Sequence, residues 1–331
     1  MWEWLKSLWE DPTQNFSAAY LAGRDGDPAP GKPIEPGQQY FTISLECMRL
    51  VYAREAFTKF YGVLSGRVGF DLTAGPEAIT LIISPDALKG VEKADLGRVI
   101  VQTVPLCEKV PYIGGSIELR LALLSLEATN LLTGVVDVLT SVASAAGVGY
   151  VEQAKTFLAP IEKGINLLIR QGGCEIALYK AISEPRTGYF CVARAPHDRL
   201  ALEKCRLSPT WELIDQNGKV TKDVPYFVVR LQAHDKKGNF ARIPSVRDAY
   251  AKLHDAATKS DEQTAKEAFE FFRRTVIWSA DLHPHDRDEM IDFARKQLEA
   301  SFPPTRTAAK PLERLATPRA FPELEQLVPW S

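Results

Sequence analysis

The densest group of side chains able to bind a metal or transfer protons lies at residues 281–289. It contains His283, His285 and Glu289 together with three aspartates. If Pro284 opens a helix, His285 and Glu289 lie one turn apart on one face, a spacing suited to two metal ligands, and Asp281 or His283 could add a third from the preceding turn. A metal-dependent hydrolase using His283, His285 and Glu289 is therefore one hypothesis.

The simpler interpretation of residues 281–289 is structural, and we favour it. Free amides and the helix dipole stabilise negative charge in the first turn of a helix. Acidic residues are therefore expected around Pro284 without any catalytic role. On this interpretation the chain holds no metal or other cofactor.

A cysteine nucleophile is a second possible chemistry, and it needs a histidine to remove the thiol proton. The candidates are Cys191 or Cys205 with His197, His234 or His254. Cys191 lies inside an apolar run, which suits a buried thiol better than a nucleophile. The chain has five cysteines, and none forms a CxxC pair. Scattered thiols of this kind indicate a reducing, cytoplasmic location.

Common enzyme and nucleic-acid signatures are absent from the sequence. It contains no GxxxxGK[ST] phosphate loop, no GxGxxG after a strand pattern and no GxSxG nucleophile turn. The 40 basic and 42 acidic side chains give a net charge of −2, which argues against a nucleic-acid partner because such proteins normally carry a basic excess. These absences favour a non-enzymatic protein.

The two ends of the chain carry apolar side chains beside proline-rich stretches at 23–37 and 303–331. A short isolated helix is unstable in water, so these side chains must be covered, either by the chain's own core or by a partner. Tryptophan is a favoured interface anchor. We therefore expect the ends to be arms that bind a protein partner or sister subunit, using Trp2, Leu5, Leu8 and Trp9 at one end and Phe321, Leu324, Leu327 and Trp330 at the other.

The elements between the two ends begin with short strands. Residues 40–47 alternate, with Phe41, Ile43, Leu45 and Cys47 on one face and polar residues on the other. Further strands are expected at 60–64, 67–72, 79–84, 99–104, 117–127, 175–181, 189–194, 211–215, 219–221 and 225–233. The Asn217-Gly218 pair predicts a type I′ hairpin turn. The strand at 225–233 is apolar on both faces, so we expect it to be central in its sheet.

Helical periodicity predicts a hairpin at 130–170 and three later helices at 245–257, 261–278 and 284–301. Ser245 and Asp261 are the expected N-caps, and Pro284 suits a first helical turn. The apolar stretch at 131–151 approaches the length of a membrane span, but it contains Asp137. This argues for a core helix and against a membrane.

These patterns together predict an α+β fold, namely an antiparallel β-sandwich with an inserted helical hairpin, followed by a C-terminal helical unit. The expected parts are an N-terminal helix and linker (1–37), the sandwich domain (38–240), the helical unit (241–302) and a proline-rich tail (303–331). The leading hypothesis is an accessory or scaffolding subunit of a multi-protein assembly. The alternatives are a membrane-active effector that inserts the 130–170 hairpin and the metal-dependent hydrolase.

Overall fold

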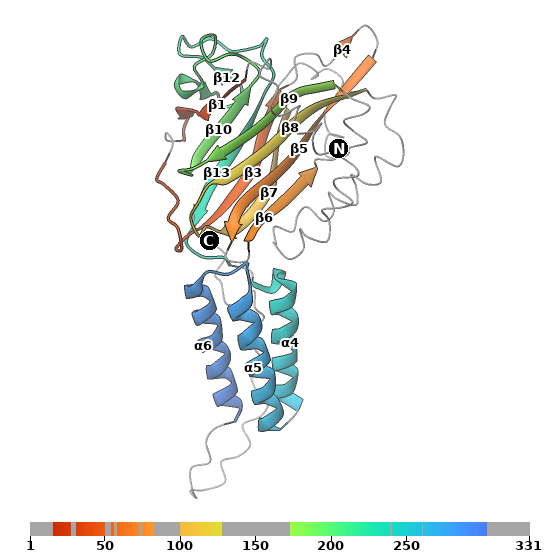
Figure 1. Cartoon of the computed structure of the whole chain (residues 1–331), viewed down its shortest axis with the longest axis vertical. Coiled ribbons are helices and arrows are strands. Elements are labelled where there is room, and N and C mark those ends of the chain that lie inside the picture. Colours follow the sequence, from red (N-terminus) through yellow and green to blue (C-terminus); the bar gives the residue numbers. More distant parts are fainter. Residues whose placement is uncertain are drawn as a thin grey trace, which may run out of the picture. The chain divides into compact units, whose positions relative to one another are not determined.

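A computed structural model describes residues 16–27, 31–49, 54–55, 58–72, 75–82, 100–127, 173–238, 240–259 and 261–302. The chain divides into two compact units, 1–234 and 235–331. The described part of the first unit is built mainly of strands, and that of the second mainly of helices (Figure 1). The predicted α+β class with antiparallel strands is therefore confirmed.

The elements follow one another along the chain with these bounds: β1 (Ser17–Tyr20), β2 (Gly23–Arg24), β3 (Tyr40–Arg49), β4 (Arg54–Glu55), β5 (Thr58–Leu72), β6 (Gly75–Ile82), β7 (Ile100–Pro111), β8 (Ile117–Glu127), β9 (Gly173–Ile182), β10 (Gly188–Ala193), the 3₁₀ turn η4 (Leu202–Lys204), β11 (Arg206–Leu207), β12 (Leu213–Ile214), β13 (Tyr226–His234), the 3₁₀ turn η5 (Phe240–Arg242), α4 (Pro244–Lys259), α5 (Glu262–Trp278) and α6 (Pro284–Ser301).

One sheet has the strand order β1-β10-β13-β3-β7, and all its pairings are antiparallel. The central position predicted for β13 is confirmed, because it lies between β10 and β3. Its first four residues are buried, and Arg230 is half-buried. A strand with apolar side chains on both faces is stable only where both faces are buried. In the middle of a sheet, the backbone groups of such a strand are also hydrogen-bonded on both edges.

A bulge in β3 corrects the predicted alternation of that strand. Leu45 pairs with Val229 and Cys47 with the adjacent Val228, so Glu46 is the extra residue. Val228 and Val229 are neighbours in β13 and point to opposite faces of the sheet. Their partners Cys47 and Leu45 therefore also point to opposite faces. The expected face of Phe41, Ile43, Leu45 and Cys47 therefore loses Cys47 to the other side. The polar face is also buried rather than wet, because the whole of β3 is buried.

A second sheet has the order β4-β5-β8-β9, with β6 also paired to β5. Residues 58–72 form one long strand where the sequence predicted two. The similar sequences at 116–123 and 174–181 pair with each other in β8 and β9, for example Leu121 with Leu178. In a third, small sheet β2 pairs in parallel with β11, which pairs with β12. The expected helical hairpin at 130–170 lies outside the described residues.

The described part of the segment before β3 is not the linker that the sequence predicted within residues 1–37. β1 adds to the edge of the first sheet by pairing with β10. The backbone amides of Gly31 and Ile34 donate to the carbonyls of Thr187 and Pro185 at 2.8 and 2.9 Å. Proline and glycine content suggested a linker, but the residues between the prolines still carry amides that can pair with the segment between β9 and β10.

The turn at Asn217-Gly218 is not of the predicted type. Gly218 has φ +79°, but Asn217 is not among the residues with positive φ, whereas a type I′ turn needs both. The Asp215 carboxylate accepts hydrogen bonds from the amides of Asn217 (2.8 Å) and Lys219 (2.9 Å). This local bonding favours a type I turn closed by a glycine in the left-handed region.

The three helices match their predicted positions closely. Asp261 is the N-cap of α5, because its side chain accepts from the amide of Thr264. Pro284 occupies the first turn of α6 as expected. Ser245 is not an N-cap, since α4 already begins at Pro244. Within the described residues, no helix combines the length and apolar character needed to cross a membrane.

Candidate functional site

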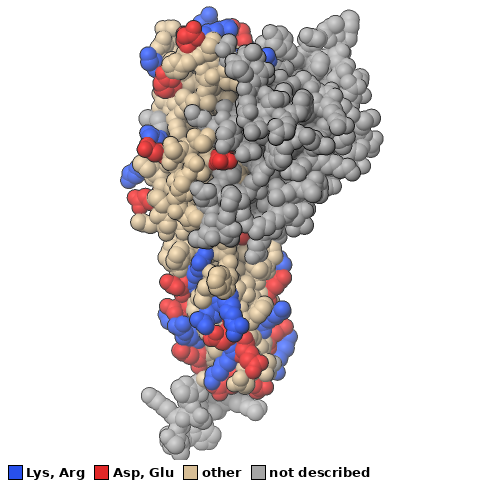
Figure 2. All heavy atoms as spheres, viewed as in Figure 1, with Lys and Arg blue, Asp and Glu red and all other residues tan. Residues whose placement is uncertain are grey.

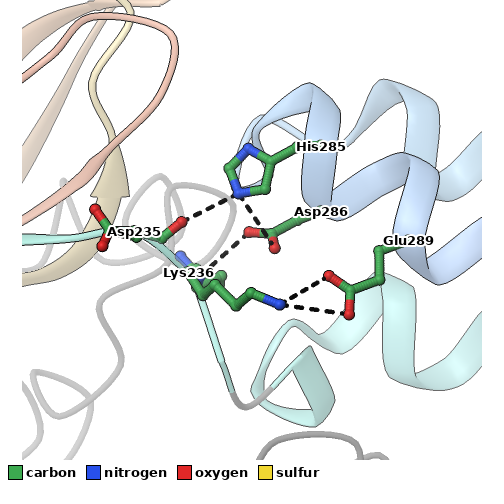
Figure 3. A network of polar contacts seen from close by, with 6 residues as sticks. Asp235, Lys236, His285, Asp286 and Glu289 are labelled. Carbon is green, nitrogen blue, oxygen red and sulfur yellow. Dashed lines mark hydrogen bonds and ion pairs between the residues drawn. The ribbon is translucent and has the colours of Figure 1, made fainter.

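The start of α6, where the sequence places its most polar cluster, forms a network with the segment before α4 (Figure 3). His283 is the N-cap residue, and Asp286 is the third residue of the helix. The Asp286 carboxylate is fully buried and accepts a hydrogen bond from the backbone amide of Lys237 at 3.2 Å. Its place in the first turn matches the preference of the helix dipole for negative charge.

His285 is held by groups that determine which of its ring nitrogens donates a hydrogen bond. Its Nε2 lies 3.1 Å from the backbone carbonyl oxygen of Asp235 and 3.5 Å from Oδ1 of Asp286 (Figure 3). A carbonyl oxygen can only accept, so Nε2 carries a proton and donates it. This nitrogen therefore has no lone pair for a metal. The ring of His283 stacks on that of His285, with centroids 5.9 Å apart.

Glu289, the third residue of the metal hypothesis, is engaged elsewhere. Its two carboxylate oxygens lie 3.5 and 3.1 Å from Nζ of Lys236 (Figure 3). Among the described residues, no group of three histidine, cysteine, aspartate or glutamate side chains is arranged to hold a metal ion. The contacts of His285 and Glu289 are those of a structural network at a helix start.

A buried ion pair lies in the same region. Nζ of Lys237 is 3.7 Å from Oδ1 of Asp281, and the side chains are 3% and 0% exposed. Two charges withdrawn from water need each other, because either one alone would be costly to bury. The pair therefore links the segment before α4 to the segment before α6.

Three cysteines of the first unit form part of a core and are not activated. Cys47, Cys191 and Cys205 belong to one buried cluster. The thiols of Cys47 and Cys205 lie 3.9 and 3.4 Å from the backbone carbonyls of Trp211 and Ala201, to which they donate. Burial raises the pKa of Cys205 to about 11 and that of Cys47 and Cys191 above the ordinary value. A nucleophile needs the opposite shift.

A cluster of aromatic and charged residues surrounds Trp211. This residue has φ +66°, a conformation that non-glycine residues rarely adopt. Arg24 lies over the ring, 4.2 Å from its centroid, and Tyr189 meets the ring edge-on at 5.8 Å. The hydroxyl of Tyr226 donates to the Trp211 carbonyl at 3.1 Å. These contacts hold the unusual backbone in place and cover part of the indole.

Tyr189 in this cluster is held in its protonated form. Its hydroxyl donates to Oδ2 of Asp27 at 2.5 Å, and Arg230 lies 3.4 Å from the same oxygen. Burial, and then the hydrogen bond to Asp27, raises the pKa of Tyr189 to about 12. A phenol that keeps its proton in this way cannot act as a base near neutral pH. The cluster is best explained as a structural element.

The feature that packing does not explain is an exposed apolar surface on α5. Trp278 is 85% exposed and Phe271 50% exposed. They lie seven residues apart, two helical turns, and so share one face of the helix with Glu267 and Arg274. We call these four residues the α5 surface. The opposite face of α5 packs against α4 and α6 through Ala265, Phe269, Phe272 and Val276.

Charged residues of both signs are frequent on the helical unit. Figure 2 shows Lys, Arg, Asp and Glu side chains interspersed over the visible face of the helical unit, the lower part of that view. Nζ of Lys252 lies 4.9 Å from the ring centroid of Phe271. A tryptophan left open to water in such surroundings is unusual for a side chain whose burial is strongly favourable.

The sequence pattern did not predict the α5 surface. The spacing of Phe271 and Trp278 was visible, but apolar residues on a helix are first assigned to its core face. The residues predicted to bind a partner, Trp2, Leu5, Leu8, Trp9, Phe321, Leu324, Leu327 and Trp330, all lie outside the described residues. Their role stays a prediction.

Comparison with known proteins gives no relative from which a function could be carried over. No protein-family model, no curated protein and no solved structure matches this chain. The function is therefore inferred from the geometry described above.

Proposed function

We propose that this protein is a non-enzymatic interaction protein, an accessory or scaffolding subunit of a multi-protein assembly, whose helical unit binds a partner through the α5 surface. The observation that supports this most directly is the 85% exposure of Trp278. Tryptophan and arginine are the residues most enriched at the energetic centre of protein interfaces. The α5 surface contains one of each, Trp278 and Arg274.

The chemistry of the other candidate residues favours binding over catalysis. The thiols are buried and their pKa values are raised. Glu289 is paired with Lys236, and His285 is bonded to a backbone carbonyl. No observation therefore favours the metal-dependent hydrolase. The hairpin of the membrane-active alternative lies outside the described residues, and nothing in the structure favours that function either.

The proposal includes the features predicted only from sequence. The terminal clusters are arms that bind the same assembly, and their support is the tryptophan-rich composition beside proline-rich stretches.

Face-to-face packing of the larger sheets as a sandwich is supported by strand alternation, and a helical hairpin at 130–170 by apolar periodicity. A cytoplasmic location is supported by the scattered thiols.

The experiment compares two full-length variants that each remove one exposed apolar side chain. Trp278→Ser changes the α5 surface, and Ile113→Ser, in the first unit, is the matched control, since Ile113 is 37% exposed. Proteins that co-purify from the native host with the parent chain but not with Trp278→Ser are identified, purified and titrated against each variant.

We expect Trp278→Ser to raise the dissociation constant by ~30-fold. This is the effect of losing an interface anchor that contributes about 2 kcal/mol to the binding free energy. Ile113→Ser should bind like the parent. Equal binding by all three proteins, with each variant folded by circular dichroism, would show that the α5 surface is not a docking site.

A further inference from the structure

The charges on α5 are of two kinds. Away from the α5 surface they pair within the helix, Lys266 with Glu262 at 2.7 Å and Arg273 with Glu270 at 2.8 Å. On the α5 surface, Glu267 and Arg274 make no ion pair with any residue that the structure describes. The Glu267 carboxylate accepts a hydrogen bond from the side-chain amide of Gln263, at 3.0 Å. The same surface thus presents one acid and one base, both available to a partner.

The spacing of these two charges prevents them from pairing with each other. Glu267 and Arg274 are seven residues apart, about 10.5 Å along a helix that rises 1.5 Å per residue. A second helix with the same sequence can pair both if it runs antiparallel, because Arg274 of each then lies opposite Glu267 of the other. A parallel helix would oppose like charges. The surface is therefore complementary to a copy of itself in one orientation.

We propose that the α5 surface binds a second copy of this chain, forming a two-fold symmetric dimer in which the α5 helices run antiparallel. The inference rests on the proposed function, since it names the partner of the same surface. A symmetric interface uses the same patch on both subunits and must be self-complementary. A different protein would have to supply both an acid and a base at the matching distance.

The same register places the aromatic residues sensibly. In this register the two-fold axis passes midway between residues 267 and 274, which is within half a residue of Phe271. The two Phe271 rings therefore meet near the symmetry axis. Trp278 of each copy then lies opposite Gln263 of the other, where it is removed from water. The apolar contacts provide affinity, and the two Arg274–Glu267 pairs set the orientation.

The experiment uses sedimentation equilibrium of the full chain over a wide range of concentration, with variants Trp278→Ala, Arg274→Glu and Glu267→Arg. Lys296→Glu, a charge reversal at an exposed position of α6, is the control. Trp278→Ala should weaken the dimer by ~30-fold. Each reversal on the α5 surface should also weaken it, because like charges then meet in both pairs, whereas Lys296→Glu should dimerise like the parent.

The decisive step is to mix Arg274→Glu with Glu267→Arg. Each variant alone opposes like charges, but in the mixed dimer both pairs become opposite charges again, so a one-to-one heterodimer should form. Circular dichroism of each variant separates loss of pairing from loss of folding. A parent chain that stays monomeric at all concentrations, or a dimer that is insensitive to the α5 variants, would overturn the inference.

The test also separates this inference from the proposed function. If the parent chain is monomeric while Trp278→Ser still loses a different purified partner, the second copy is the wrong occupant and the docking function stands. If Trp278 variants change neither self-association nor any other binding, both proposals are wrong.

Discussion

Lys237 and Asp281 form an ion pair that is shielded from water, with Nζ 3.7 Å from Oδ1 and side-chain exposures of 3% and 0%. A neighbouring pair, Lys236 with Glu289, has a shorter distance of 3.1 Å but exposures of 63% and 61%. Both pairs start from the segment before α4; one reaches the segment before α6 and the other reaches α6 itself. They differ mainly in their contact with solvent, which makes them a matched test of how burial changes the worth of a charge.

We predict that Asp281→Ala destabilises the fold by about 3–5 kcal/mol, because it removes one partner of a buried ion pair. Glu289→Ala should cost about 0–1 kcal/mol, because an exposed pair contributes little. Urea unfolding monitored by circular dichroism measures both. Similar losses in the two variants would show that burial is not the cause.

The stability of the fold should fall in alkaline solution. Burial raises the pKa of Cys205 from 9.0 to about 11, so the folded chain keeps this thiol protonated where the unfolded chain releases the proton. The contribution is complete below about pH 9 and is lost as the pH rises to about 11. Urea unfolding across this range should show a decline that is smaller in Cys205→Ala. An identical slope in both proteins would contradict the prediction.

Replacement of Gly218 should weaken the turn at 215–218. Its φ of +79° is unfavourable for any side chain, and a Cβ at this position would meet nothing within 4 Å, so the cost is one of backbone conformation. Gly218→Val should destabilise by about 1–3 kcal/mol. Gly218→Asn is the control, since asparagine tolerates the left-handed region and should lose less. Thermal unfolding measures the stability of both variants. Equal melting temperatures for Gly218→Val and Gly218→Asn would show that the backbone conformation of Gly218 is not the cause.

Deletions at the N-terminus should differ sharply by length. Removing residues 1–37 takes away β1, which pairs with β10, together with the contacts of Gly31 and Ile34, so the melting temperature should fall. The sequence predicted a helix and linker at 1–37, whereas part of this segment belongs to the first sheet. Removing only residues 1–15, or 303–331, should leave the melting temperature nearly unchanged and weaken association with a partner. Differential scanning calorimetry and a binding titration test this pair of outcomes.

Those parts of the fold that depend on neighbouring residues were predictable from the sequence. Asp261 caps α5 and Pro284 opens α6, because capping and proline geometry act within one turn of chain. The central position of β13 followed from its apolar residues on both faces, which require cover on both sides. The polar cluster at 281–289 likewise follows the local electrostatics of a helix start.

The remaining features were decided only by contacts between residues far apart in the chain. The bulge at Glu46 depends on the register of β3 against β13, and the pairing of Lys237 with Asp281 depends on how the segments before α4 and α6 meet. The exposure of Trp278 is likewise decided by the packing of segments that are distant in the sequence. Helical periodicity places an apolar residue on a face, but whether that face is covered is decided by what packs against it, and α4 and α6 pack against the other side of α5.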